Sequence, residues 1–181
     1  FFFTHKTPYA ILSGLVGSEM CIRDRFNNDS EHFKLSEPDP LSKFDIVEFN
    51  DSEGNKYNIS DFSGKFILMN FWATWCLPCR VEMPSLDNLQ EEMGDENFQV
   101  IIVSVERTDF SKVDDFLKEI NIKNLSNYHD PTTMVGKHIN AKGLPITILF
   151  DKNGKEIGRY NGDFEWDSKE VIKFITKLKN S

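Results

Sequence analysis

A run of apolar residues that ends just before a pair of cysteines is the feature that most limits the possible folds. Residues 65–72 read KFILMNFW, and Cys76 and Cys79 follow at C-x-x-C spacing. A near-continuous apolar run of this length is typical of a central strand that is covered on both faces. After Cys79 the apolar positions recur with a helical period, which puts Val81 and Leu86 on the expected buried face. The sequence therefore predicts a buried strand, a cysteine pair and then a helix.

The rest of the chain alternates strand and helix signals. We expect a hairpin at 44–49 and 57–59, a strand at 98–105, a helix at 113–120, a short helix at 130–139, hairpin strands at 145–150 and 156–160, and a last helix from 167. The order strand, helix, strand, helix implies a parallel pair with a right-handed crossover. Asp167 and Glu170 fit a capping box at the start of the last helix. The predicted fold class is α/β, with one core.

Charge and cysteine count exclude several classes of protein. The net charge of -8 at pH 7 would repel polyanions, and no run of Lys or Arg is longer than two, so we expect no nucleic-acid partner. Three cysteines are too few for a disulfide framework. The expected partners are therefore other proteins.

The beginning of the chain is predicted to lie outside the domain. Residues 1–25 contain LVGSEMCIRDR, which resembles a translated library adapter, and we interpret them as a non-native or disordered head. Their apolar run at 9–16 is shorter than the roughly 20 residues that span a bilayer. Residues 26–42 are polar and contain Pro38 and Pro40, which predicts an extended linker before a domain at 43–181. We expect that an export signal or membrane anchor has been lost from the native start.

The cysteine pair is the candidate reactive site. A helix N-terminus offers unpaired N–H groups and a partial charge of roughly +0.5, which stabilise a thiolate. Cys76 is placed at this point, so we predict an exposed nucleophile with a pKa below the free value of about 8.5. Cys79, one turn further and facing inward, would be the resolving thiol that displaces a mixed disulfide between Cys76 and its partner. Beyond this redox-active disulfide, Cys76–Cys79, we expect no cofactor.

Three longer segments carry a resemblance to a known family. They read NFWATWCLPCRVEMPSLDNLQ, GLPITILFDKNGKEIG and GDFEWDSKEVIKFI. Over residues 43–181 the chain resembles the TlpA-like branch of the thioredoxin superfamily, the membrane-tethered periplasmic reductants that include ResA-type and cytochrome c biogenesis proteins. The resemblance implies a thioredoxin-like fold, in which helices flank a central mixed sheet, with an N-terminal β-hairpin and an inserted helical segment.

The same resemblance implies a function. It indicates a thiol-disulfide oxidoreductase in the bacterial periplasm, membrane-anchored in its native form, that reduces disulfides of client proteins in cytochrome c or cytochrome oxidase biogenesis. An upstream membrane thiol-disulfide protein would then supply the electrons. The direction of electron flow stays open, because oxidants and reductants share this fold and differ in how strongly they stabilise the thiolate form.

Roles for residues around the cysteines follow from the resemblance. Pro145 matches the family's cis-proline, which faces the cysteine pair, although local sequence is equally compatible with a trans proline that opens a strand. The backbone of Leu144 would pair with the incoming substrate strand. Trp75 would shield the sulfurs, while Leu77 and Pro78, between the cysteines, would tune the redox potential and contact the substrate.

Glu82 matches an acidic residue of the ResA-type members that lies near the thiols. If burial raises its pKa toward neutrality, its carboxylate could take the proton of Cys79 as that thiol attacks. The alternative is a solvated residue in the first helical turn, favoured there by the helix dipole. Asn70 stands where many thioredoxins have a buried Asp, so proton transfer would run through Glu82 or water.

Two other chemistries compete for the same cysteines. A copper or zinc carrier is the main alternative, but a structural zinc site needs four ligands, and His129 and His138 are far from the cysteines in the sequence. We therefore predict no metal site. Carriers of the Sco type use C-x-x-x-C with a late His, a spacing that this chain lacks. A peroxiredoxin would need Pro in place of Met69 and Ser or Thr in place of Ala73.

Overall fold

The structure, a computed structural model, describes residues 33–180. A seven-stranded mixed sheet forms the centre of this part of the chain. The strands are β1 (Phe49–Asn50), β2 (Lys56–Tyr57), β3 (Phe66–Trp72), β4 (Phe98–Ser104), β5 (Ser126–His129), β6 (Ile146–Phe150) and β7 (Glu156–Asn161). The helices are α1 (Leu77–Met93), α2 (Phe110–Glu119), α3 (Val135–His138) and α4 (Lys169–Lys179), with 3-10 turns η2 (Phe44–Ile46) and η3 (Ile59–Phe62). The predicted head at 1–25 lies outside the described residues.

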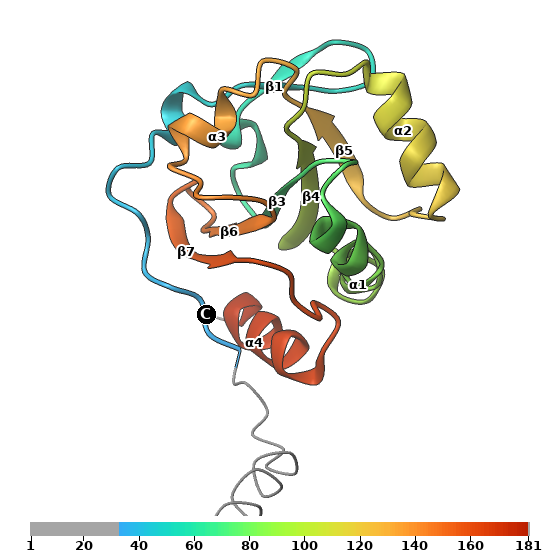
Figure 1. The fold of residues 1–181 in the computed structure, drawn as a ribbon. Coiled ribbons are helices and arrows are strands. Elements are labelled where there is room, and N and C mark those ends of the chain that lie inside the picture. The colour runs from blue at the N-terminus through green and yellow to red at the C-terminus, as the bar shows by residue number, and fades with distance from the viewer. Residues whose placement is uncertain (1–32, 181) are drawn as a thin grey trace, which may run out of the picture. The chain divides into compact units, whose positions relative to one another are not determined.

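The order of the strands brings the chemistry to one edge of the sheet. That order is β2-β1-β5-β4-β3-β6-β7, with β3, β4 and β5 parallel and β6 antiparallel to β3 (Figure 1). Trp72 pairs with Ser104, and Ser104 pairs with His129, so the three parallel strands end side by side. The loops that leave these strands therefore lie together at the carboxyl edge, where α/β sheets usually carry their sites.

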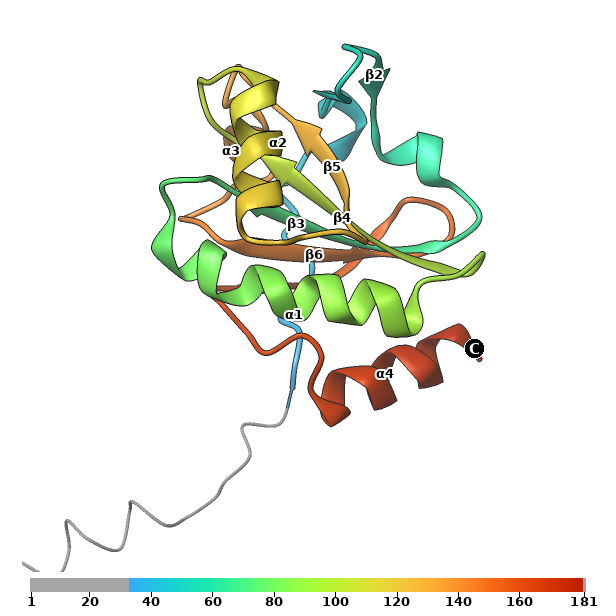
Figure 2. The same cartoon turned by 90° about the vertical axis from the view of Figure 1, so that its right-hand side faces the viewer.

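The two faces of the sheet bury separate apolar cores. Alternate residues of β3 enter each core, as the period of a strand requires: Leu68 and Trp72 pack on the face that α1, α2 and α4 cover, and Ile67 and Met69 pack on the opposite face with α3. Helices α1 and α4 lie side by side on their face (Figure 2). The run at 65–72 is thus a central strand, as predicted, because every residue of β3 is buried.

Helix α1 lies where it was predicted, but a different set of its residues faces the core. It begins after Cys76 and ends before Gly94. Val81, which we assigned to the buried face, is 66% exposed, whereas Glu82 is buried. A periodic pattern read from apolar residues alone cannot anticipate a carboxylate on the inner face, because burying one normally costs free energy.

The described part of the predicted linker lies against the domain. The compact unit begins at Phe33 rather than at residue 43. Ser36 forms an isolated antiparallel bridge with Arg159 of β7, and the buried guanidinium of Arg159 also donates to the Ser42 hydroxyl at 2.7 Å. These bonds connect residues more than 100 positions apart, so local composition suggested a linker where tertiary contacts form an extra edge segment.

The ends of two further elements differ from the sequence-based expectation. The opening hairpin is present, but β1 and β2 have two residues each, and Phe44–Ile46 is a 3-10 turn. Helix α4 begins after Ser168, whose side chain makes no capping bond, so the predicted capping box is absent. The Glu170 carboxylate instead accepts the backbone N–H of Phe33 at 3.0 Å.

Candidate active site

Cys76 and Cys79 lie where the segment after β3 enters α1, and the structure joins them as a disulfide. Cys76 is the N-cap residue of α1, and its Sγ accepts the backbone N–H of Cys79 at 3.4 Å. The positive end of the helix therefore faces this sulfur, which favours its thiolate. Cys79 is fully buried, as predicted, but Cys76 is only 5% exposed. The expected exposed nucleophile is buried in the disulfide form, because Cys76 packs in the same apolar core as Trp72 and Cys79.

The loop between β3 and the cysteines is held by Glu106. Its Oε1 accepts the backbone N–H of Thr74 at 2.7 Å, and its Oε2 accepts the Thr74 hydroxyl at 2.9 Å. Glu106 follows β4, the parallel neighbour of β3, and is 7% exposed. Sequence patterns did not indicate this residue. The available signal was an acidic residue just after a buried strand, which is also common in ordinary surface loops.

Glu82 is a buried carboxylate on the helix that carries the cysteines. It is 2% exposed, so the alternative of a solvated first-turn residue is wrong. Its Oε1 accepts from the side-chain amide of Asn70 at 2.8 Å, and its Oε2 accepts from the indole N–H of Trp166 at 2.8 Å and the backbone N–H of Phe164 at 3.2 Å. Burial raises the pKa of Glu82 from 4.5 to about 7, against the lowering effect of the three hydrogen bonds.

Asn70 links Glu82 to the neighbouring strand. Its amide Nδ2 donates both to Glu82 and to the hydroxyl of Thr147 on β6, the latter at 2.9 Å, and all three residues are buried. Thr147 was not indicated by the sequence. Cys79 and Glu82 are three residues apart on α1, so they share a helix face.

Pro145 and Leu144 lie at the same edge of the sheet as the cysteines. The peptide bond between them is cis. Pairing between β3 and β6 ends at Phe71 and Ile146. Pro145, the residue before Ile146, therefore lies beside the end of β3, from which the cysteine loop departs. The carbonyl of Pro145 accepts the backbone N–H of Gly162 at 3.0 Å, which fixes this turn to the end of β7.

The remaining predicted residues form an exposed apolar rim around the disulfide. Trp75 and Leu77 are each 69% exposed, and Pro78 is also exposed. Val81, one turn further along α1, belongs to the same surface. Apolar side chains of this size are normally buried, and a group of them beside a reactive pair marks a contact surface.

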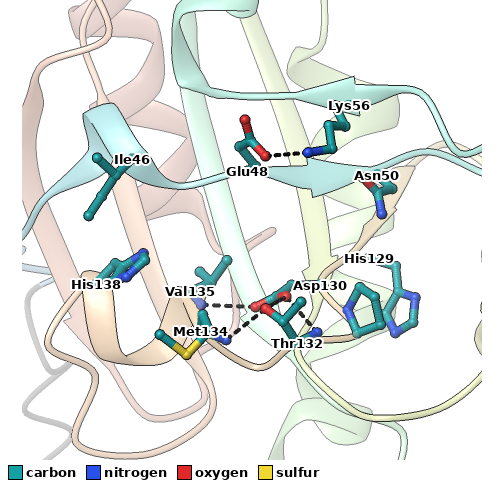
Figure 3. A pocket seen from close by; sticks show the side chains of 11 residues that line it. Ile46, Glu48, Asn50, Lys56, His129, Asp130, Thr132, Met134, Val135 and His138 are labelled. Atoms are coloured by element: carbon teal, nitrogen blue, oxygen red, sulfur yellow. Dashed lines mark hydrogen bonds and ion pairs between the residues drawn. The ribbon is translucent and has the colours of Figure 1, made fainter.

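A cavity of about 210 Å³ lies between β1, β2, β5 and α3 (Figure 3). Lys56 and Glu48 form an ion pair at 2.8 Å in its wall, and Asp130 accepts backbone N–H groups there. His129, also in the wall, contacts the carbonyl oxygen of Glu106 through Nε2 at 2.8 Å. None of the described residues that line the cavity is a predicted site residue.

Two further observations concern metal and membrane. Within residues 33–180, no group of three or more His, Cys, Asp or Glu side chains is arranged to hold a metal ion. None of the helices in the described part of the chain combines the length and the apolar character needed to cross a bilayer.

A disulfide at the N-terminus of a helix, beside a parallel strand end and the turn at Pro145, defines the class of this protein. It is a protein thiol-disulfide oxidoreductase of thioredoxin-like fold. The model of the family described as Redoxin matches residues 38–174, and the chain belongs to this family.

Similarity to individual proteins agrees with this assignment. ResA, a thiol-disulfide oxidoreductase of Bacillus cereus, is 31% identical over 171 residues, which cover 93% of this chain and 91% of ResA. The structure of a protein described as thiol:disulfide interchange protein DsbE, from Chlorobium tepidum, superposes with a TM-score of 0.66 at 24% identity and covers 82% of this chain and 100% of that one. The exposed lipoprotein thioredoxin Etrx1 of Streptococcus pneumoniae gives 0.61 at 25% identity, covering 73% and 98%. The predicted TlpA/ResA relationship is confirmed.

Proposed function

We propose that this protein reduces disulfides of client proteins outside the cytoplasm, in the biogenesis of cytochrome c or of the copper site of cytochrome oxidase. The observation that carries the proposal is the Cys76–Cys79 disulfide at the start of α1, with the buried Glu82 one turn behind it. In the bacterial periplasm a membrane anchor would keep the protein near its clients. The relative named an exposed lipoprotein supports a tethered location.

The chemistry is a two-electron exchange that begins from the dithiol. The Cys76 thiolate attacks one sulfur of the client disulfide, the other client sulfur leaves as a thiolate, and a mixed disulfide forms. Cys79 then attacks Cys76, and the second client thiolate leaves. The client gains two electrons, the Cys76–Cys79 disulfide forms, and an upstream membrane thiol-disulfide donor would reduce it again.

Glu82 would act in the second step. Cys79 must lose its proton to attack, and a carboxylate with a pKa of about 7 can accept a proton at neutral pH more readily than an ordinary glutamate. The proton stays in the buried network with Asn70 until solvent takes it. Pro145 and the backbone of Leu144 would position the client chain across the sulfurs, with Trp75, Leu77 and Pro78 contacting its apolar side chains.

Replacement of Cys76 tests the proposal directly. Cys76→Ser should abolish reduction of insulin disulfides, whereas Cys79→Ser should retain the first step and accumulate a mixed disulfide with the client. Retained turnover in Cys76→Ser would reject the proposal. Stoichiometric copper or zinc bound through both thiols in the purified protein would favour the carrier alternative.

The reduction potential decides the direction of electron flow. A value of about -270 mV, as for thioredoxin, is expected for a reductant, whereas a value of about -120 mV would indicate an oxidant of client proteins. Equilibration with glutathione or dithiothreitol buffers, read by thiol alkylation, measures it.

A further inference from the structure

An N-terminal segment, residues 33–36, lies along β7 and is called the strap below. The backbone N–H of Ser36 donates to the Arg159 carbonyl at 2.8 Å, and the N–H of Arg159 donates back at 3.2 Å. The Ser36 hydroxyl adds a bond of 2.9 Å to the same carbonyl. The strap is therefore fixed to the sheet at one end by reciprocal bonds of the antiparallel kind.

The middle of the strap requires a glycine beneath it. A Cβ placed on Gly158 would lie 2.8 Å from the Cβ of Leu35 and 3.3 Å from the carbonyl oxygen of Ser36. Real Cβ atoms essentially never approach another atom to less than 3.0 Å, so the contact with Leu35 forces a shift. The close contact between strap and β7 thus exists because position 158 has no side chain, and Gly158→Ala would push the strap outward.

The first described residue, Phe33, ends the strap inside an aromatic cluster. Its ring centroid lies 5.3 Å from Phe164, 5.8 Å from Trp166, 5.3 Å from Phe174 and 6.4 Å from Tyr160. These are the separations of attractive ring pairs, and the Trp166 and Phe174 pairs are edge-to-face. The bond from the Phe33 N–H to Glu170 holds the backbone of the strap at this place.

Two members of this cluster are the donors to one oxygen of Glu82. The Trp166 indole N–H and the Phe164 backbone N–H both bind Oε2, at 2.8 and 3.2 Å, and Phe33 packs on both residues. Trp166 is fully buried, with its backbone N–H bound to the Ser85 hydroxyl at 3.1 Å. A continuous set of contacts therefore leads from the strap to the carboxylate.

We propose that Phe33 is a positioning residue of the active site: by packing on Trp166 and Phe164, it holds their N–H groups on Glu82 and keeps water from the carboxylate. The inference rests on the proposed function, in which Glu82 takes the proton of Cys79. It extends that function to Phe33, a residue far from Trp166 in the sequence.

The surroundings of Glu82 decide whether its pKa rises or falls when the strap is displaced. Asn70 from β3, and Trp166 and the Phe164 amide from the segment after β7, donate to it, and nearby Asp163 raises its pKa. Burial is the largest influence and raises the pKa, while the bonds lower it. Lifting the strap admits water, so the loss of burial outweighs the weakened bonds. The pKa of Glu82 then falls from about 7 toward 4.5.

The experiment follows the Trp166 indole N–H by NMR as a function of pH in the full-length oxidised protein. In the disulfide form neither cysteine titrates, and the indole proton is bonded to Glu82, so its chemical shift reports the charge of that carboxylate. Trp166→Phe assigns the signal. Glu82→Gln should abolish the titration, and the wild-type midpoint is expected at about pH 7.

Two independent variants lift the strap, and one matched variant does not. Phe33→Ala removes the ring, and Gly158→Ala pushes from below. Each should lower the midpoint by about one pH unit. Phe33→Leu, which keeps a large apolar side chain, should keep the midpoint close to the wild-type value. Gly136→Ala, where a Cβ meets nothing within 4 Å, should leave the midpoint unchanged.

The outcomes separate this inference from the proposed function. If Phe33→Ala and Gly158→Ala fold but keep the wild-type midpoint, Phe33 has only a structural role and the inference is overturned. The titration needs no turnover. The midpoint would therefore still be lowered in Phe33→Ala and Gly158→Ala even if Glu82→Gln reduced disulfides at the wild-type rate. That second result would remove Glu82 from the mechanism while leaving the coupling between strap and carboxylate intact.

Discussion

The side-chain amide of Asn70 donates to Oε1 of Glu82 at 2.8 Å, which joins the strand before the cysteines to the helix that carries them. The two residues are 12 positions apart in the chain, on either side of Cys76 and Cys79. A buried hydrogen bond thus connects the strand and the helix on either side of the reactive loop. An acidic group that shares a helix face with Cys79 is held in place from the neighbouring strand.

Glu82→Gln should slow the second step of disulfide exchange. The amide keeps the shape of the carboxylate but cannot accept the Cys79 proton, and general-base catalysis of this kind contributes about 100-fold or more. We expect a loss of about 100-fold at pH 7, measured by stopped-flow mixing of the dithiol form with oxidised insulin. An unchanged rate and pH profile would exclude Glu82 as the proton acceptor.

The stability of the oxidised protein should depend on pH through Glu82. Its folded pKa of about 7 lies above the ordinary value of 4.5, so the folded state holds the proton more tightly. The stability that this proton provides is complete below about pH 4.5 and is lost as the pH rises through about 7. The difference amounts to roughly 3 kcal/mol.

Urea unfolding of the oxidised wild type and Glu82→Gln at pH 5 and pH 8 measures this effect. The wild type should lose more free energy of unfolding between the two pH values than the variant does. Equal losses in both proteins would show that the carboxylate titrates normally in the folded state.

Removal of Glu106 should loosen the loop that presents Cys76. Glu106→Ala leaves the Thr74 N–H without its acceptor, at a cost of about 1–3 kcal/mol in the free energy of unfolding. Thr74→Val, which removes only the hydroxyl bond, should cost less, about 1 kcal/mol. Chemical denaturation measures both. Wild-type stability in Glu106→Ala would mean that the loop does not depend on this carboxylate.

Val81 in the apolar rim should contribute to client binding and not to the exchange chemistry. Val81→Ser is expected to raise KM for insulin several-fold while leaving the rate with a small aliphatic disulfide near the wild-type value. Leu41→Ser is the matched control, because Leu41 is 69% exposed, close to the 66% of Val81, but belongs to the segment before the domain's first 3-10 turn. Equal effects of both variants would argue against a specific contact surface.

Patterns within a few residues of the cysteines predicted the local structure correctly. The apolar run of β3, the N-cap position of Cys76 and the stop at Gly94 all depend on neighbours in the sequence, so they can be read from it. The same reasoning misplaced Val81, since the inner face of α1 includes a carboxylate. It also predicted a capping role for Glu170, which binds Phe33 instead.

The sequence by itself determined the reactive pair Cys76 and Cys79, the family relationship and most of the order of strands and helices, because periodicity, spacing and motif are local properties. Strand β5, Ser126–His129, was not predicted. Only the tertiary structure decided the surroundings of Glu82. Trp166, one of its donors, is 84 residues away along the chain, and the Thr74 loop is held from a neighbouring strand. Whether a carboxylate is solvated or buried depends on what packs over it, and that packing involves segments whose proximity no local pattern encodes.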